Sequence, residues 1–361
     1  MGFGDFEHLC SEAAIPLCSE VGPITSVAGS HGIEANCYAR NIELANTIIF
    51  QGASSFIHIG SLIMTVIMIL HVRSKFTAVG EYSPPSVSAQ ATPSLNAAPV
   101  LMFLKIGRKE ITSFFYIFMG LSFISLCLDA GVIPPGSSTF PYFAAVQNGL
   151  TSALCMCLLI NGFVGFQLYE DGTPLSVWLL RGVSFVFFII TGLVSLATFK
   201  SWAGLGPTKT LGMFVMLYLV NGIALLVYVI MQVILVVNTL QDRWPLGDIA
   251  FGVFFLIIGQ VILYVFSTTI CNAVQHYLDG LFFATICNLL AIMMVYKYWD
   301  SITREDLEFS VGIKQNNWEV KELLPEDDRR TTVYQDTEYS APGYTHSDRV
   351  RTSNYGGFGG Y

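Results

Sequence analysis

Seven runs of mostly apolar residues, each about 20 residues or longer, alternate with short polar loops along this chain. A helix rises about 1.5 Å per residue, so about 20 residues cross the roughly 30 Å of hydrocarbon in a bilayer. A segment inside lipid must satisfy its own backbone hydrogen bonds, which favours helices over open strands. The sequence therefore predicts an all-α, polytopic membrane protein with a seven-helix bundle over residues 48–298. The predicted transmembrane helices are Ile48–Leu70, Thr112–Val132, Phe143–Phe166, Val177–Phe199, Leu211–Val237, Ile249–Ile270 and Leu278–Tyr298.

Composition agrees with a membrane protein. Hydrophobic residues make up 53% of the chain and charged residues only 12%, which is too apolar for one soluble globule of 361 residues. The formal net charge of −8 is concentrated before the first predicted span and after Asp300. This acidic balance gives no support to nucleic-acid binding or to a basic membrane-binding surface.

The distribution of Lys and Arg predicts the orientation, because positively charged loops stay in the cytoplasm. The segment before the first span carries one basic residue, Arg40, whereas Lys200 and Lys209 in the fourth loop oppose the trend. Seven spans then place residues 1–47 in the lumen or outside the cell and residues 299–361 in the cytoplasm as a largely disordered tail. Residues 1–20 show no cleavable signal peptide, so the first span is expected to direct insertion. The basic residues of the first loop, which dominate the count, are Arg73, Lys75, Lys105, Arg108 and Lys109.

Three of the eight cysteines, Cys10, Cys18 and Cys37, lie in the predicted luminal segment, where the compartment is oxidising. We expect one disulfide among them, most simply between Cys10 and Cys18, with Cys37 as the alternative partner. The other cysteines lie in or beside the spans and are interpreted as small packing residues. They are Cys127, Cys155, Cys157, Cys271 and Cys287.

Segment 81–107 interrupts the pattern, because a Ser/Pro/Ala-rich composition is typical of a disordered linker. One hypothesis is therefore a genuine cytoplasmic linker. The other is a retained intron, since Gly80-Glu81-Tyr82 can be encoded with a splice-donor consensus and Ile106-Gly107 with an acceptor. The segment also corresponds to a whole number of codons, so removing it keeps the reading frame. We favour the retained intron.

No catalytic constellation is visible. A zinc-dependent intramembrane hydrolase needs several His and a carboxylate facing one cavity. Only His58, His71 and His276 lie near spans, with Asp129 and Asp279 at span ends, so we expect no metal site. We interpret His58 as a hydrogen-bonded core residue. Glycine-rich phosphate loops are also absent, and no cofactor is expected.

Several longer stretches closely resemble the fungal chitin synthase export chaperones. The likeness covers about residues 1–80 and 108–300, and segment 81–107 departs from the family pattern. The tail after about Asp306 is less diagnostic. The stretches that carry the resemblance are Met1–Phe6, Ile15–Cys18, Asn41–Asn46, Leu70–Phe76, Asp129–Gly136, Ala145–Gly149 and Asn161–Pro174.

The resemblance implies a chaperone in the endoplasmic reticulum membrane that helps a chitin synthase to fold and leave the reticulum, and so supports chitin deposition in the cell wall. It implies no catalysis. The expected partners are a chitin synthase as client and the lipid bilayer. A seven-span receptor is the alternative from another class, and an intramembrane hydrolase is a more remote one.

Two sets of residues are candidates for this function. Asn161, Asn221 and Asn288 lie in predicted spans, where amides form either interhelical hydrogen bonds or contacts with the client. Asp336 and Glu338 in the tail have a spacing similar to di-acidic cargo signals, which vesicle-coat cargo receptors would bind. Such a short match arises often by chance, so we favour a solvated, disordered tail for the acidic pair, with the cargo signal as the alternative.

Overall fold

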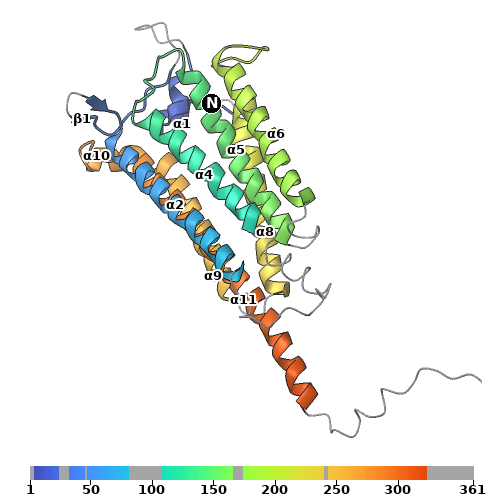
Figure 1. Ribbon diagram of the computed structural model, residues 1–361. Helices are drawn as coiled ribbons and strands as arrows, with labels where there is room; N and C mark the ends of the chain where they lie inside the picture. Colours follow the sequence, from blue (N-terminus) through green and yellow to red (C-terminus); the bar gives the residue numbers. More distant parts are fainter. Residues whose placement is uncertain are drawn as a thin grey trace, which may run out of the picture. The chain divides into compact units, whose positions relative to one another are not determined.

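The structure is a computed structural model that describes residues 4–23, 32–44, 47–80, 108–165, 174–239 and 243–322. The chain divides into two compact units, Met1–Thr303 and Arg304–Tyr361. Among the described residues, seven helices are long and apolar enough to cross a membrane (Figure 1). The predicted all-α, seven-helix membrane architecture is therefore confirmed.

Six of the seven spans lie in single helices: α2 (Gly52–Gly80), α4 (Arg108–Asp129), α5 (Phe140–Gly165), α6 (Pro174–Phe199), α9 (Trp244–Tyr264) and α11 (Gly280–Glu322). The fifth span is composite: α7 (Leu211–Phe214) leads into a π-helical segment, η2 (Val215–Val220), and then into α8 (Asn221–Thr239). Small residues allow close helix packing in membranes. A Cβ atom on Gly149 of α5 would lie only 2.8 Å from the carbonyl oxygen of Phe188 on α6, so these two helices approach closely.

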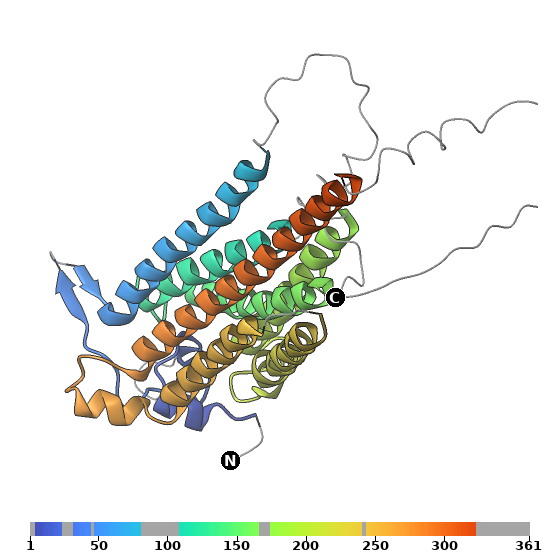
Figure 2. The same ribbon diagram turned by 90° about the horizontal axis from the view of Figure 1, so that it is seen from below.

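Short elements gather at one end of the bundle. They are α1 (Glu7–Glu12), the 3-10 turn η1 (Pro16–Ser19), a hairpin of β1 (Ile42–Leu44) and β2 (Thr47–Ile49), and α10 (Ser267–Ala273). Figures 1 and 2 show α1, the hairpin and α10 at this same end. We call residues 4–23 and 32–44 the cap, and the end of the bundle that they cover the capped end.

Hydrogen bonds tie the cap to loops that are distant in sequence. Thr210 Oγ1 donates to the Gly4 carbonyl at 2.8 Å, and the Gly22 N–H donates to the Pro207 carbonyl at 2.9 Å. Phe6 of the cap is 1% exposed and belongs to an apolar cluster with residues of α4, α5 and α6. The cap is therefore a packed part of the bundle end rather than a free arm.

Two predicted span boundaries were wrong. Ile48 was expected to begin the first span, but it lies in β2, paired with Glu43, and the helix begins at Gly52. The β-branched run Thr47–Ile49 suits a strand as well as a helix. The sixth span ends at Tyr264 instead of Ile270, because the chain turns at Phe266 and starts a separate short helix.

The last helix also differs from expectation. The seventh span was predicted to end at Tyr298, with a largely disordered tail after it, but α11 continues to Glu322. Residues 304–322 of this helix belong to the second unit. Segment 81–107 and the acidic pair Asp336 and Glu338 lie outside the described residues, so the hypotheses on them stay predictions.

Candidate functional site: intramembrane polar residues and the cap

Asn221 makes a hydrogen bond between two spans. Its Nδ2 donates to Ser152 Oγ on α5 at 3.0 Å, and the residue is only 4% exposed. Asn148 of α5 forms a similar bond to Ser195 Oγ on α6 at 3.2 Å. Such bonds hold membrane helices together with roughly 1 kcal/mol each. The contacts of Asn221 are therefore those of an interhelical residue.

Asn161 and Asn288 have different surroundings. Asn161 Nδ2 donates to the carbonyl oxygen of Cys157, one turn earlier on the same helix, at 2.9 Å. Asn288 is half-buried on α11 and makes no hydrogen bond to any other residue that the structure describes. An amide without a partner in a membrane is available to a polar group of a second protein, because lipid offers it no hydrogen bond.

A buried histidine and a carboxylate link the first two spans. His58 Nε2 on α2 lies 2.9 Å from Asp129 Oδ2 at the end of α4. His58 is 9% exposed and Asp129 is 5% exposed. The interpretation of His58 as a hydrogen-bonded core residue agrees with this contact. No sequence pattern links His58 to Asp129, which lies 71 residues away.

Asp279 is a second buried carboxylate at the capped end. It lies directly before α11, where its Oδ1 accepts a hydrogen bond from the Phe282 N–H at 3.1 Å, as in an N-cap. Burial raises the pKa of Asp279 above its usual range, and the charge of Asp129 adds to this effect. A buried carboxylate therefore lies at the start of α11, and another, Asp129, lies at the end of α4.

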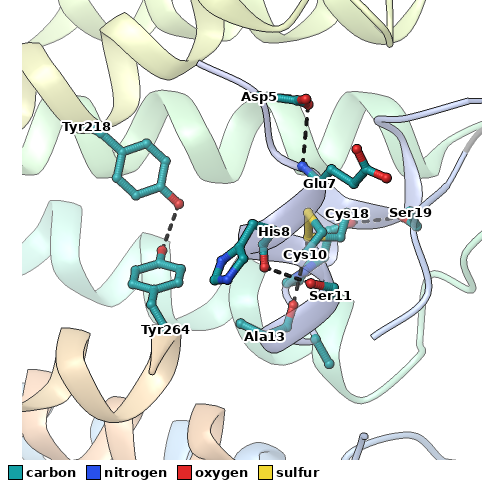
Figure 3. Close-up of a disulfide and its surroundings, with 12 residues drawn as sticks. Asp5, Glu7, His8, Cys10, Ser11, Ala13, Cys18, Ser19, Tyr218 and Tyr264 are labelled. Atoms are coloured by element: carbon teal, nitrogen blue, oxygen red, sulfur yellow. Dashed lines mark hydrogen bonds between the residues drawn. A yellow bond between two sulfur atoms is a disulfide. The ribbon is translucent and has the colours of Figure 1, made fainter. Parts of the chain in front are cut away.

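Two disulfides hold the cap. The structure joins Cys10 to Cys18 within the cap (Figure 3), and Cys37 to Cys271 on α10. The interpretation of Cys271 as a packing residue was wrong. Hydropathy placed it beside the sixth span, whereas the helix ends earlier and Cys271 lies on α10. The second bridge therefore connects the cap to the loop between the last two spans.

A tyrosine pair lies beside the cap. The hydroxyl groups of Tyr218 and Tyr264 are 2.7 Å apart and connect η2 with the end of α9 (Figure 3). Phe6 of the cap packs against the Tyr218 ring, with ring centroids 5.9 Å apart. A π-helical segment is often found at a functional position in a helix. The sequence did not predict it, because a π turn has no distinct apolar pattern.

Among the described residues, one cluster brings together three side chains of the kinds that bind metals: Cys37, Cys271 and His276. Both sulfur atoms are joined in the disulfide, so neither is the thiolate that a metal requires. His276 Nδ1 lies 3.2 Å from Cys37 Sγ and thus packs against the bridge. The cluster is therefore a disulfide with a histidine packed against it, and it is not suited to bind a metal.

Comparison with known proteins identifies the family. The profile of the family described as chitin synthase export chaperone matches residues 2–83 and 102–313. A protein named chitin synthase export chaperone from Aspergillus fumigatus is 64% identical over 359 residues, which cover 99% of each chain. The protein with the same name from Coccidioides immitis is 64% identical over 363 residues, which cover 100% of each chain. That from Chaetomium globosum is 65% identical over 339 residues, or 94% of each chain.

No solved structure matches the chain. The family profile nevertheless covers the cap and all seven spans, and the relatives extend over nearly the whole length. With its seven membrane helices and its capped bundle, this chain belongs to the chitin synthase export chaperone family.

Proposed function

We propose that the protein is a membrane chaperone of the endoplasmic reticulum that assists the folding and export of a chitin synthase. The near-complete likeness to proteins with that name is the observation that carries the proposal. A client with many spans exposes polar groups and unpaired helix faces until it is assembled. Amides in the spans of the chaperone form hydrogen bonds with such polar groups. The family assignment does not favour a receptor or a hydrolase. Export of the client in a strain without the protein is the decisive experiment, and it is described in the Discussion.

We also propose that the capped end faces the lumen of the reticulum. The concentration of Lys and Arg in the first loop supports this orientation. The disulfides give independent support, because both lie at the capped end and disulfides persist in oxidising compartments. In this orientation the export signal proposed for Asp336 and Glu338 is cytoplasmic, where vesicle-coat cargo receptors can bind it.

For the client contact, we propose the helix pair α9–α11 and its unpaired amides. Gly259 of α9 packs against Cys287 of α11, where an added Cβ atom would lie 2.9 Å from the Cys287 Cβ. Gly252 lies beside Met294 in the same way, so the two helices run antiparallel. Gln260 and Asn288 directly follow Gly259 and Cys287, and in antiparallel helices this step turns both side chains to the same side of the pair. Both are half-buried, and neither has a hydrogen-bond partner among the described residues. They are suited to bind a polar residue of a client helix.

Leucine substitutions separate the two roles of the amides. Asn288→Leu should leave the abundance of the chaperone unchanged and reduce delivery of chitin synthase to the surface, because only a client bond is lost. Asn221→Leu should lower the abundance of the chaperone, because it removes an internal bond of roughly 1 kcal/mol and leaves Ser152 without its donor. Quantitative blotting and surface labelling of the synthase measure both. Normal export with Asn288→Leu would exclude this amide from the contact.

We propose that segment 81–107 is encoded by a retained intron. The family profile supports an insertion within this segment, because its match stops at residue 83 and resumes at residue 102. Transcript sequencing should find a dominant message without codons 81–107, and a protein lacking them should export the client at least as well. If growing cells contain only the longer message, the segment is a genuine linker.

A further inference from the structure

Four buried oxygen atoms near the capped end have no hydrogen-bond partner in the part of the chain that the structure describes. They are Gln51 Oε1, Ser54 Oγ, Asp129 Oδ1 and Asp279 Oδ2. Ser54, Asp129 and Asp279 are between 1% and 5% exposed. Leaving a buried polar group unpaired costs roughly 1–3 kcal/mol, and more for a charged group. Four such atoms at the capped end leave oxygens that a ligand would satisfy.

Contacts between the elements bring these side chains to one region. Ser54 and His58 are one turn apart on the same face of α2, and His58 contacts Asp129. The Phe50 N–H donates to the Ala130 carbonyl at 3.3 Å, which holds the start of α2 beside the end of α4. The first turn of α2 and the last residue of α4 therefore face one another.

Asp279 and Gln51 approach the same region from the cap side. The Asp279 carboxylate lies at the start of α11, where the Phe282 N–H donates to its Oδ1. Gln51 Nε2 donates to the Ala14 carbonyl of the cap at 3.2 Å. The neighbouring cap residue, Ala13, lies in one apolar cluster with Ala284 and Leu281, in the first turns of α11. The cap thus holds Gln51 near the helix start at which Asp279 lies.

In Asp129, Asp279 and Gln51, one polar atom of the side chain makes a hydrogen bond, and one oxygen has no hydrogen-bond partner among the described residues. His58 holds Oδ2 of Asp129, the Phe282 N–H holds Oδ1 of Asp279, and the cap holds the amide nitrogen of Gln51. Gln51 also has a φ of 43°, a left-handed conformation that costs about 1–3 kcal/mol in a non-glycine residue. Its surroundings therefore impose its position. This is the preorganisation that a ligand site requires.

The chemistry of the four oxygens points to the ligand. Two carboxylates, one amide oxygen and one hydroxyl form an all-oxygen set, which hard cations prefer over softer transition metals. Two carboxylates also balance the charge of a divalent ion. Ca²⁺ accepts six to eight oxygens in flexible geometry, whereas Mg²⁺ demands a near-ideal octahedron and loses water reluctantly.

We infer that the capped end binds one hard divalent cation, Ca²⁺ in preference to Mg²⁺, through Gln51, Ser54, Asp129 and Asp279. Backbone carbonyls and water complete the coordination. His58 is a positioning residue, because its contact with Oδ2 aims Oδ1 of Asp129 at the ion. The ion connects α2, α4 and the start of α11, and through Gln51 it reaches the cap.

Calorimetric titration of Ca²⁺ into the purified full-length protein, first stripped with a chelator, tests this inference. We expect one ion per chain and a higher thermal midpoint with Ca²⁺ than with equal Mg²⁺. Asp129→Asn and Asp279→Asn preserve shape and should abolish both effects. His58→Ala should weaken Ca²⁺ binding about 10- to 100-fold without changing the stoichiometry, as outer-shell substitutions do. Glu43→Gln is the matched control, because Glu43 is an exposed carboxylate of the cap. This variant should bind Ca²⁺ like the wild type.

Thermal unfolding in chelator shows whether the asparagine variants are folded. Both should unfold near the wild-type midpoint there. Asp279→Asn removes a buried charge that has no cationic partner among the described residues, and the amide oxygen introduced by Asp129→Asn still accepts a hydrogen bond from His58. Unchanged Ca²⁺ binding in both variants, or an equal loss with Glu43→Gln, would overturn the inference. A midpoint that responds to pH but not to Ca²⁺ would also overturn it, because a proton would then occupy the site. The experiment uses no client, so its outcome is independent of the proposed chaperone function.

Discussion

Replacing Cys37 and Cys271 together by serine should destabilise the protein more than replacing Cys10 and Cys18 together. The Cys37–Cys271 bridge joins residues 234 positions apart, whereas the Cys10–Cys18 bridge joins residues only 8 positions apart. A disulfide restricts the unfolded chain more when it closes a longer loop, and the loop-entropy relation gives a difference of up to about 3 kcal/mol. The long bridge also fixes the cap to α10, whereas the short one acts within the cap. Its loss should therefore loosen the capped end.

Two measurements compare the serine pairs. The thermal midpoint of the purified protein should fall further for Cys37→Ser/Cys271→Ser than for Cys10→Ser/Cys18→Ser, and the half-life in cells should fall in the same order. The pairs match in chemistry, since each removes two sulfur atoms and leaves no unpaired thiol of its own bridge. Equal losses in the two variants would mean that the long bridge does not hold the cap to the bundle.

The seven spans could be predicted from sequence because hydrocarbon thickness and backbone hydrogen bonding leave few solutions for a long apolar run. The boundaries that were missed lie where apolar residues continue past a break. Val265 and Phe266 are apolar, yet α9 ends before them, and hydropathy cannot register this turn. The hairpin at Thr47–Ile49 was missed for a related reason, since β-branched residues are apolar in strands and helices alike.

The residues at the capped end were individually visible in the sequence, but their partners were not. Asp129 and Asp279 stood out as carboxylates at span ends, while their relation to His58 and Gln51 depends on how three helices and the cap meet. Cys271 needed the same information, because its partner lies 234 residues earlier. Long-range pairing is a property of packing, and a single sequence shows no periodicity that reveals it.

The structure also sorts residues that the sequence could only group. Asn161, Asn221 and Asn288 were equal candidates as amides in spans. Their contacts differ: one bonds within its own helix, one joins two helices, and one has no partner among the described residues. These differences depend on which face of each helix meets a neighbour, and on that basis Asn288 is the one of these three that is proposed as a client contact.

Export of chitin synthase in cells that lack this protein tests the central claim most directly. The synthase should be made at a normal rate but held in the reticulum, with less cell-wall chitin, while other multispanning cargo reaches the surface. Selectivity is expected because a dedicated partner recognises particular exposed helix faces. Re-expression of the chain should restore export. Surface labelling of the synthase after a pulse of synthesis gives the result, and delivery at the wild-type rate in the null strain would contradict the chaperone assignment.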